Sequence, residues 1–390
     1  MPRPTSDRGT RPTASPSNAR LDEAGLARIA LPIAAIAAFV AIPGVVVLAA
    51  AQASTLGFDF QSYHQAAQRV LAGEPIYDPS IQQTGGFGLF YYPPPFVLAV
   101  LPFALLPAAT ATWVWLALSV AMLVGAIAIL PVRSSVRWGT LLLAGLSWPV
   151  AYALKLGQVG PLLLLLFAIG WRWLDRPAAV GAAGALGAIV KIQPGLILVW
   201  ALLTRRFGAV AIGAAILVVA AIAATIVLGG FGVWADYVAL LRNVSDPITT
   251  PHNFTPGAAA YQFGVPTGVA ATIQILSSVL VVAVFLIAIA RTAPDASFLV
   301  TVIASQLLSP VLWDHYAMLL LLPVAWLLQR RQWWAAAIPL VTSAVTLFVN
   351  LPAVIYPLMF WVTLVAVLGV GLAERRDRGE PSVPAEAVVA

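Results

Sequence analysis

Residues 57–95 read GFDFQSYHQAAQRVLAGEPIYDPSIQQTGGFGLFYYPPP and form the first polar segment after a long apolar run. Within this segment, Phe58 to Leu71 can form a helix that carries Asp59 and Tyr63 on one face, because residues four apart are neighbours on a helix surface. Glycine commonly terminates helices, so this helix should end at Gly73. A carboxylate placed just past a membrane-spanning run, beside tyrosines, suits either a general base for a hydroxyl group or the packing of a loop.

The composition is that of a helical protein that crosses a membrane several times. Of the 390 residues, 61% are hydrophobic and only 9% are charged, whereas about 25% are charged in a typical soluble domain. The mean hydropathy is +0.93. The chain has no cysteine, which excludes disulfides, thiolate zinc sites and cysteine nucleophiles. The chain has only three histidines, and we expect neither a metal site nor a cofactor. The basic residues lie in short loops between apolar runs, where they set the topology, so no nucleic-acid partner is expected.

The apolar runs divide the chain into candidate membrane segments. Ile29 to Ala51 is long enough to span, and we interpret it as an uncleaved anchor with a cytoplasmic N-terminus. Phe96 to Pro107 is short for a crossing and is expected to be juxtamembrane or tilted, whereas Thr110 to Pro131 should span. Further apolar runs lie at 138–154, 159–174, 178–190, 193–204, 208–229, 267–290, 296–311, 316–329, 333–350 and 353–373.

These runs predict an all-α polytopic membrane protein with roughly 11–13 transmembrane helices. The transmembrane domain should cover residues 29–373, with outer loops at 52–95, which is helical in part, and at 230–266. Residues 1–28 and 374–390 are expected to be disordered cytoplasmic tails; the first is rich in Pro, Ser, Thr and Arg.

The basic residues support this orientation. If the runs alternate from a cytoplasmic N-terminus, all but four of the 21 basic residues lie on the cytoplasmic side, as the positive-inside rule requires. The four exceptions are Arg69, Lys155, Lys191 and Arg242. A full crossing at 96–107 would invert the later loops and lose this bias, unless 178–204 were a single span. All three histidines and both lysines then lie on the outer side, where we expect the activity to be.

Two clusters have a structural interpretation that is as good as a functional one. Asp59, Tyr63 and His64 could form a site or a solvated helix face. Lys155 and Gln158, in the sequence KLGQ, could bind a ligand or form a hairpin turn whose lysine reaches the membrane surface.

Two further clusters favour function more strongly. Lys191 interrupts an apolar stretch whose halves would each be roughly 20 Å long as helices, shorter than the roughly 30 Å hydrocarbon core. A lysine partly inside the membrane is a functional candidate, and it could hold the phosphate of a lipid carrier. The run from Trp313 to Tyr316 fits an aromatic belt or a sugar platform with a hydrogen-bonding His–Asp pair. The segment around His252 and Asn253 is a weaker candidate.

Several segments occur in a characteristic order over roughly residues 55–330: GFDFQSYHQAAQRVLAGEPIYDP, FYYPPP, KLGQVGPLLLLL, KIQPG followed by LLTRRF, HNFTPGAA and SPVLWDHY. Through them the chain resembles glycosyltransferase family 87, the membrane mannosyltransferases that use polyprenyl-phosphate-mannose and have a GT-C fold. One departure is visible: the family pattern leads us to expect a second histidine after His315, where this chain has Tyr316.

The resemblance implies an inverting enzyme of the plasma membrane. It would move a sugar, mostly mannose, from a polyprenyl-phosphate donor to a hydroxyl of a glycolipid, lipoglycan or envelope glycan on the outer face, with an α-linkage as the product. Asp59 matches the expected catalytic base. The donor phosphate would be met by three cationic side chains: Lys191, His315 and Lys155. Substrate binding is expected from Tyr63, His64, Gln158, Tyr92, Trp313, Asp314, His252 and Asn253.

Two alternatives stay open. One is a GT-C transferase for another lipid-linked sugar, such as arabinofuranose. The other is a lipid or sugar transporter, which should show paired internal repeats and charged residues near the midplane of several helices. No such repeat is evident, and binding of different polyprenyl-phosphate sugars would separate the three possibilities.

Overall fold

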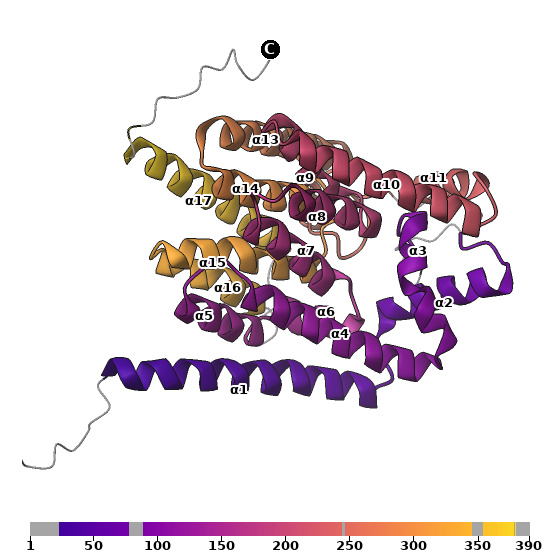
Figure 1. Cartoon of the computed structure of the whole chain (residues 1–390), viewed down its shortest axis with the longest axis horizontal. Coiled ribbons are helices and arrows are strands. Elements are labelled where there is room, and N and C mark those ends of the chain that lie inside the picture. The colour runs from indigo at the N-terminus through magenta and orange to yellow at the C-terminus, as the bar shows by residue number, and fades with distance from the viewer. Residues whose placement is uncertain (1–22, 78–88, 244–245, 345–353, 378, 380–390) are drawn as a thin grey trace, which may run out of the picture.

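The computed structural model describes residues 23–77, 89–243, 246–344, 354–377 and 379. Every regular element in these ranges is a helix (Figure 1), which confirms the predicted all-α class. The α-helices are α1 (Glu23–Gln52), α2 (Phe58–Ala72), α3 (Pro94–Val100), α4 (Ala108–Ala128), α5 (Ser134–Gly145), α6 (Trp148–Leu156), α7 (Gly160–Arg172), α8 (Pro177–Val190), α9 (Leu196–Leu203), α10 (Phe207–Val227), α11 (Gly232–Asn243), α12 (Pro256–Gln262), α13 (Thr267–Arg291), α14 (Pro294–Leu307), α15 (Leu321–Gln329), α16 (Ala337–Ala344) and α17 (Ile355–Asp377). The 3₁₀ helices are η1 (Leu101–Leu105), η2 (Gln193–Gly195), η3 (Asp314–Leu320) and η4 (Trp333–Ala336).

Five helices are long and apolar enough to cross a membrane: α1 from Arg28, α4, α10, α13 and α17. The pair α5 and α6 adds a sixth span if its 65° bend is counted as one broken crossing. Most other predicted runs form shorter apolar helices, such as α7 and α8. The count of crossings by length is therefore smaller than the predicted 11–13. The physical reason is length: α7, α8 and α14 have 13, 14 and 14 residues, fewer than the roughly 20 that one helix needs to cross the hydrocarbon core.

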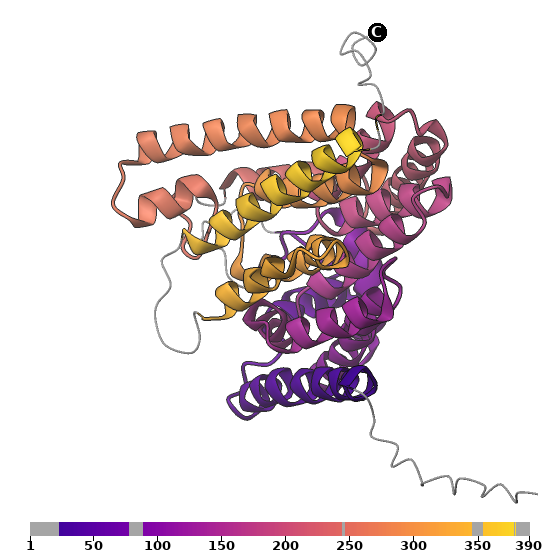
Figure 2. The same ribbon diagram turned by 90° about the vertical axis from the view of Figure 1, so that its left-hand side faces the viewer.

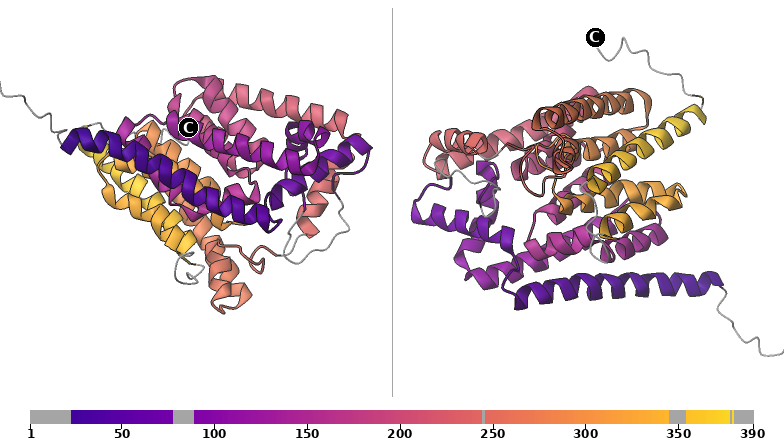
Figure 3. Two further views of the ribbon diagram at one scale, coloured as in Figure 1. Left: turned by 90° about the horizontal axis from the view of Figure 1, so that it is seen from below. Right: turned by 180° about the vertical axis from the view of Figure 1, so that it is seen from behind.

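The bundle has two distinct ends. In Figure 1, α1 begins and α17 ends at the left, whereas α2, α3 and α11 lie together at the right. The view from behind in Figure 3 shows the same separation, and α13 lies on the opposite side of the bundle from α1 (Figure 2). Both described chain ends therefore emerge on one face, and the two predicted outer loops contribute helices to the other.

The helix α2 fulfils its prediction and runs one residue past Leu71. Gly57 precedes it with φ 74° and Gly73 follows it with φ 71°, the left-handed region that glycine adopts without strain. A Cβ on Gly57 would also lie 2.5 Å from the Thr112 side chain. The Gly57 N–H donates to the carbonyl of Lys155 at 2.8 Å, which ties the start of α2 to the end of α6.

Two breaks in the apolar sequence position further side chains at the same end. The helix α6 ends at Leu156 because Gly157 adopts φ 69°. The helix α8 ends at Val190, with Lys191 in extended backbone, and Pro194 lies in the following η2 turn. The interruption predicted at Lys191 is thus confirmed.

The predicted tails differ from the structure at their inner boundaries. The helix α1 begins at Glu23, and α17 continues to Asp377, beyond the predicted end at residue 373. The extension of α17 has a physical cause, since Glu374 bonds Arg330 at 2.7 Å. Residues 1–22, 378 and 380–390 of the tails, and 78–88 of the first outer loop, lie outside the described ranges.

Candidate functional site

A cavity of about 1230 Å³ opens at the end of the bundle where α2, α3 and α11 meet. Its walls come from α2, the segment before α3, the α6 and α8 breaks, α11, the end of α14 and the segment that leads into η3. Most of the predicted site residues line it: Asp59, Tyr63, Tyr92, Lys155, Gln158, Lys191, His252, Trp313, Asp314 and His315. Elements far apart in the sequence therefore bring three carboxylates (Asp59, Asp246 and Asp314) and several cationic side chains to a common space.

Two predicted substrate-binding residues do not line this cavity. His64 is buried, with its Nε2 3.1 Å from the carbonyl of Leu106. Asn253 is buried as well, and its Nδ2 donates to the carbonyls of Pro247 and Pro310 at 2.7 and 3.0 Å. Its Oδ1 accepts from the Leu312 N–H at 2.9 Å. The bonds of both side chains hold neighbouring chain segments together, so the structure gives them packing roles.

Asp59 lies in the first turn of α2, half-buried at the cavity wall. The amide Nε2 of Gln158 donates to its Oδ2. Burial raises the pKa of the Asp59 carboxyl above its usual range, and His315, the Gln158 hydrogen bond and Lys191 act in the opposite direction. A carboxyl with a raised pKa is a better proton acceptor than a solvated one, provided that it is ionised at the working pH.

Two tyrosines support the Gln158 amide from its other side. The hydroxyls of Tyr63 and Tyr92 are 2.6 Å apart, and they lie 3.5 and 3.4 Å from Gln158 Oε1. Tyr92 is held in turn by its backbone carbonyl, which accepts from the Tyr77 hydroxyl at 2.5 Å. Tyr63 and Tyr92, predicted to bind substrate, thus bond to Gln158 while lining the cavity.

Lys191 places its ammonium group inside the cavity wall. Its Nζ donates to the Tyr316 hydroxyl and lies 4.1 Å from the Tyr316 ring centroid and 5.7 Å from that of Tyr92. Among the described residues, no carboxylate lies within ion-pairing distance of this Nζ. The charge is therefore surrounded by tyrosines and is available to an anion.

Tyr316 stands where the family pattern suggested a second histidine, and the structure gives it a role that sequence reasoning missed. Its hydroxyl accepts the hydrogen bond from Lys191, and its ring packs at 5.0 Å against His315. His315 is only 4% exposed, and neither ring nitrogen has a hydrogen-bond partner in the part of the chain that the structure describes. Its Nδ1 is 3.4 Å from Asp314 Oδ1. Because buried polar atoms are nearly always hydrogen-bonded, a buried imidazole without hydrogen bonds in a cavity wall is a candidate for a functional role.

Lys155, the third predicted contact to the donor phosphate, also lines the cavity. Lys155 is half-buried, with its Nζ 5.4 Å from the ring centroid of Tyr152. Tyr152, Tyr91 and Arg242 also line the cavity although they were not predicted as site residues. Tyr91 adjoins Tyr92 in the FYYPPP segment, and this position was the only signal that could have found it. No group of three or more His, Asp or Glu side chains within the described ranges could hold a metal ion.

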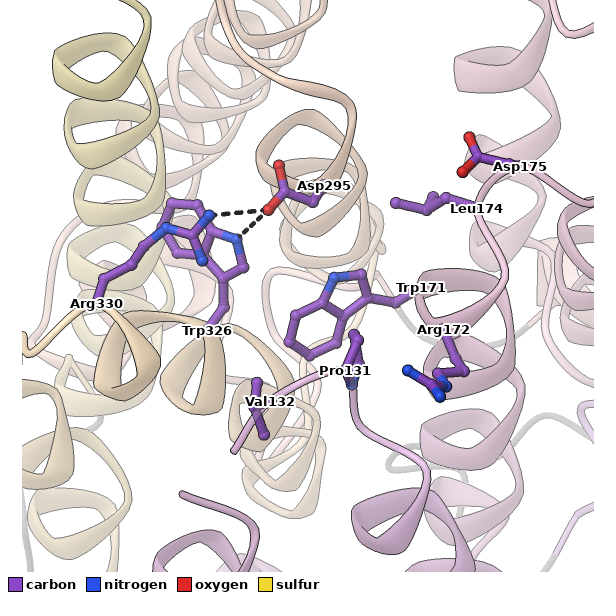
Figure 4. A pocket seen from close by; sticks show the side chains of 9 residues that line it. All are labelled: Pro131, Val132, Trp171, Arg172, Leu174, Asp175, Asp295, Trp326 and Arg330. Carbon is purple, nitrogen blue, oxygen red and sulfur yellow. Dashed lines mark hydrogen bonds and ion pairs between the residues drawn. The ribbon is translucent and has the colours of Figure 1, made fainter. Parts of the chain in front are cut away.

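A smaller pocket of about 320 Å³ lies among loops predicted to be cytoplasmic. Figure 4 shows Arg330 and Trp326 both directed at Asp295, whose Oδ2 accepts from them at 2.9 and 2.8 Å. Arg330 also pairs with Glu374 at 2.7 Å. The charges that line this side of the pocket are therefore neutralised by one another.

A family model described as glycosyltransferase family 87 matches residues 90–310, more than half of the chain. The match includes Lys155, Gln158 and Lys191, but it stops short of Asp59 and His315. No curated protein and no solved structure matches the chain.

Proposed function

We propose that this chain, which belongs to glycosyltransferase family 87 and is therefore a multi-pass membrane glycosyltransferase, transfers mannose from a polyprenyl-phosphate donor to a hydroxyl group on the outer face of the plasma membrane. The acceptor would be a glycolipid, lipoglycan or envelope glycan. The observation that carries this proposal is the placement of a carboxylate, Asp59, and an ammonium group, Lys191, in the wall of one large cavity.

The proposed donor has an anionic head and a long apolar chain, and the cavity wall offers complements to both. Next to Lys191, the residues Ile192, Leu196 and Val199 line the cavity. Ile192 is 61% exposed and Val199 is 44% exposed. A phosphate at Lys191 would thus have an accessible apolar surface beside it, against which an isoprenoid chain would lose contact with water.

In the proposed reaction the acceptor oxygen attacks the anomeric carbon of the donor sugar while Asp59 takes the hydroxyl proton. The bond from that carbon to the phosphate oxygen breaks, and its electron pair leaves with the polyprenyl phosphate. Lys191 and His315 would stabilise the charge that develops on the leaving phosphate. Attack from the side opposite the phosphate inverts the anomeric centre, so that a β-linked donor gives an α-linked product.

The purified protein with radiolabelled polyprenyl-phosphate-mannose and a glycolipid acceptor tests this proposal. We expect labelled acceptor from this donor and none from a nucleotide-linked mannose, which lacks the isoprenoid chain. Transfer from polyprenyl-phosphate-arabinofuranose, and not from the mannose donor, would show that the assignment of mannose as the sugar is wrong. Failure to bind any polyprenyl-phosphate sugar would rule out the lipid-linked donor itself.

A further inference from the structure

We propose that Gln158 is a positioning residue for Asp59: its amide, oriented by Tyr63 and Tyr92, holds one carboxylate oxygen and leaves the other to take the acceptor proton. This inference rests on the proposed function, because it assigns a role within the same reaction. It differs from the prediction that Gln158, Tyr63 and Tyr92 bind substrate directly.

The bond to Asp59 fixes which end of the amide faces the carboxylate. An ionised carboxylate has lone pairs and no proton, so it can only accept hydrogen bonds. The Gln158 Nε2 donates to Asp59 Oδ2, which leaves Oδ1 as the carboxylate oxygen without this bond. Gln158 is only 7% exposed, so water has little access to either end of its amide.

The tyrosine side favours the same orientation. Each hydroxyl carries one proton, and Tyr63 and Tyr92 lie within hydrogen-bond distance of each other and of Gln158 Oε1. Whichever hydroxyl donates to the other, the second still has a proton for Oε1. Turning the amide over would place Oε1 against the carboxylate, where two acceptors would meet without a proton between them.

The two tyrosines are themselves rigidly placed. Their rings meet edge to face with centroids 4.8 Å apart, and Tyr63 also packs against Phe96 at 5.5 Å. Both tyrosines are buried. Because Tyr63 is on α2 and Tyr92 precedes α3, the amide of Gln158 joins three separate chain segments at the carboxylate.

Other titratable groups also act on Asp59 electrostatically, so a test must separate their effect from that of Gln158. The charged or titratable side chains that influence this carboxyl, or that it influences, are His315, Asp314, Lys191, Tyr63, Tyr92, Tyr152 and Tyr316. Gln158 is uncharged, so Gln158→Met removes its hydrogen bonds at nearly constant side-chain length and leaves every one of these groups in place.

The first measurement is the pH dependence of turnover in Gln158→Met and Gln158→Glu. In the Met variant we expect the acid limb of kcat to move to higher pH by about one to two units, the equivalent of one hydrogen bond to a charged group. Gln158→Glu should move it further, because two adjacent carboxyls cannot both ionise readily. The KM values for donor and acceptor should stay within about twofold of wild type. A change in KM alone would mean that Gln158 binds the substrate and the transition state equally well. A raised KM with an unmoved acid limb would make Gln158 a substrate contact and overturn the proposal.

The tyrosines provide a second, independent arm. The double variant Tyr63→Phe with Tyr92→Phe should reproduce the shifted limb of Gln158→Met, because no hydroxyl then orients the amide. Each single variant should shift it less. Tyr356→Phe is the matched control: it is a buried tyrosine on α17 that packs on Phe254, 4.6 Å between centroids, and does not line the cavity. Equal shifts in the control and the double variant would contradict the proposal.

An infrared titration of the substrate-free protein separates this proposal from the proposed function. The protonation midpoint of Asp59 is identified by the carboxyl band that Asp59→Asn removes, and it requires no turnover. We expect a higher midpoint in Gln158→Met than in wild type. An unmoved midpoint overturns the positioning role, whereas a moved midpoint in a protein that transfers no sugar rejects only the proposed function.

Discussion

At the end of the bundle where α17 ends, Arg330 pairs with Asp295 and Glu374. Its guanidinium group lies 3.6 Å from the Trp326 ring centroid. At the cavity end, Asp59 and Lys191 form no ion pair with each other or with other described residues. Charges that pair with one another hold helices together. Charges that lie unpaired in the wall of a cavity can instead interact with a ligand. The same residue types therefore serve structure at one end and, we infer, chemistry at the other.

The comparison depends on the two ends facing opposite sides of the membrane, and labelling gives an all-or-none test. The chain has no native cysteine. Glu74→Cys should react with an impermeant maleimide in intact cells, because Glu74 is exposed at the cavity end. Arg291→Cys should react only after permeabilisation. The reverse pattern would place the cavity in the cytoplasm.

Removal of the carboxylate should have the largest kinetic effect. Asp59→Asn retains the shape and the hydrogen bond from Gln158 but cannot take a proton, so turnover should fall by at least about 10²–10⁴-fold. Donor affinity should be retained, because the proposed phosphate contacts lie elsewhere. Glu74→Gln, beyond the end of α2 and exposed to solvent, is the matched control. An Asp59→Asn enzyme with more than about a tenth of wild-type turnover would not have lost its base.

Removal of the ammonium group should weaken the donor. Lys191→Ala should raise the donor KM by about 10- to 100-fold, the value of one charge-assisted contact to a phosphate. Steady-state kinetics over a range of donor concentrations measures it. Expression should change less than the KM. A donor KM equal to that of wild type would show that Lys191 only reaches toward the membrane surface.

The pH dependence should report the partial burial of Asp59. Burial raises the pKa of its carboxyl, so protonation, and with it the loss of turnover, should begin at a higher pH than the ordinary value of about 3.9. A raised folded-state pKa also means that the ionised group destabilises the fold above that pH. Asp59→Asn should therefore have a Tm at neutral pH no lower than that of wild type. An acid limb at or below the ordinary value would contradict this.

The ion pairs of Arg330 should contribute to stability and not to turnover. Arg330→Gln should lower the free energy of unfolding by about 1–3 kcal/mol, a range that allows for partial exposure of the pair to solvent. Turnover per folded molecule should change by less than about twofold, since no catalytic group is touched. Thermal unfolding in detergent and kcat on the same preparation check both. A large loss of kcat in a fully folded Arg330→Gln protein would erase the distinction between the ends.

Local signals made several features predictable from the sequence. Gly73 ends α2 and the Lys191 interruption separates α8 from α9, because glycine, proline and a charge in an apolar run change backbone preferences over a few residues. The 12-residue helix α11 inside the second outer loop had no such signal. The length of an apolar run could not distinguish a full crossing from a short buried helix such as α14.

Partnerships across the chain were beyond prediction from one sequence. Gln158 and Asp59 are 99 residues apart, and only the fold brings the amide to the carboxylate. Asn253 illustrates the same limit on prediction. A polar residue in a recognisable motif was expected to contact substrate, yet its amide bonds backbone groups. Residue type and motif give a capacity for hydrogen bonding, and the tertiary contacts decide with which partner it is used.

The bond between the Gly57 N–H and the Lys155 carbonyl has a consequence for sequence divergence. It holds the segment that carries Asp59 through main-chain atoms alone. Every residue type at position 155 has the accepting carbonyl, and every type except proline at position 57 has the donating N–H. Drift in the side chain of residue 155 can therefore alter what the cavity recognises while the carboxylate keeps its place. The evolutionary constraint falls on Gly57 instead, because its left-handed backbone and its contact with Thr112 leave no room for a side chain.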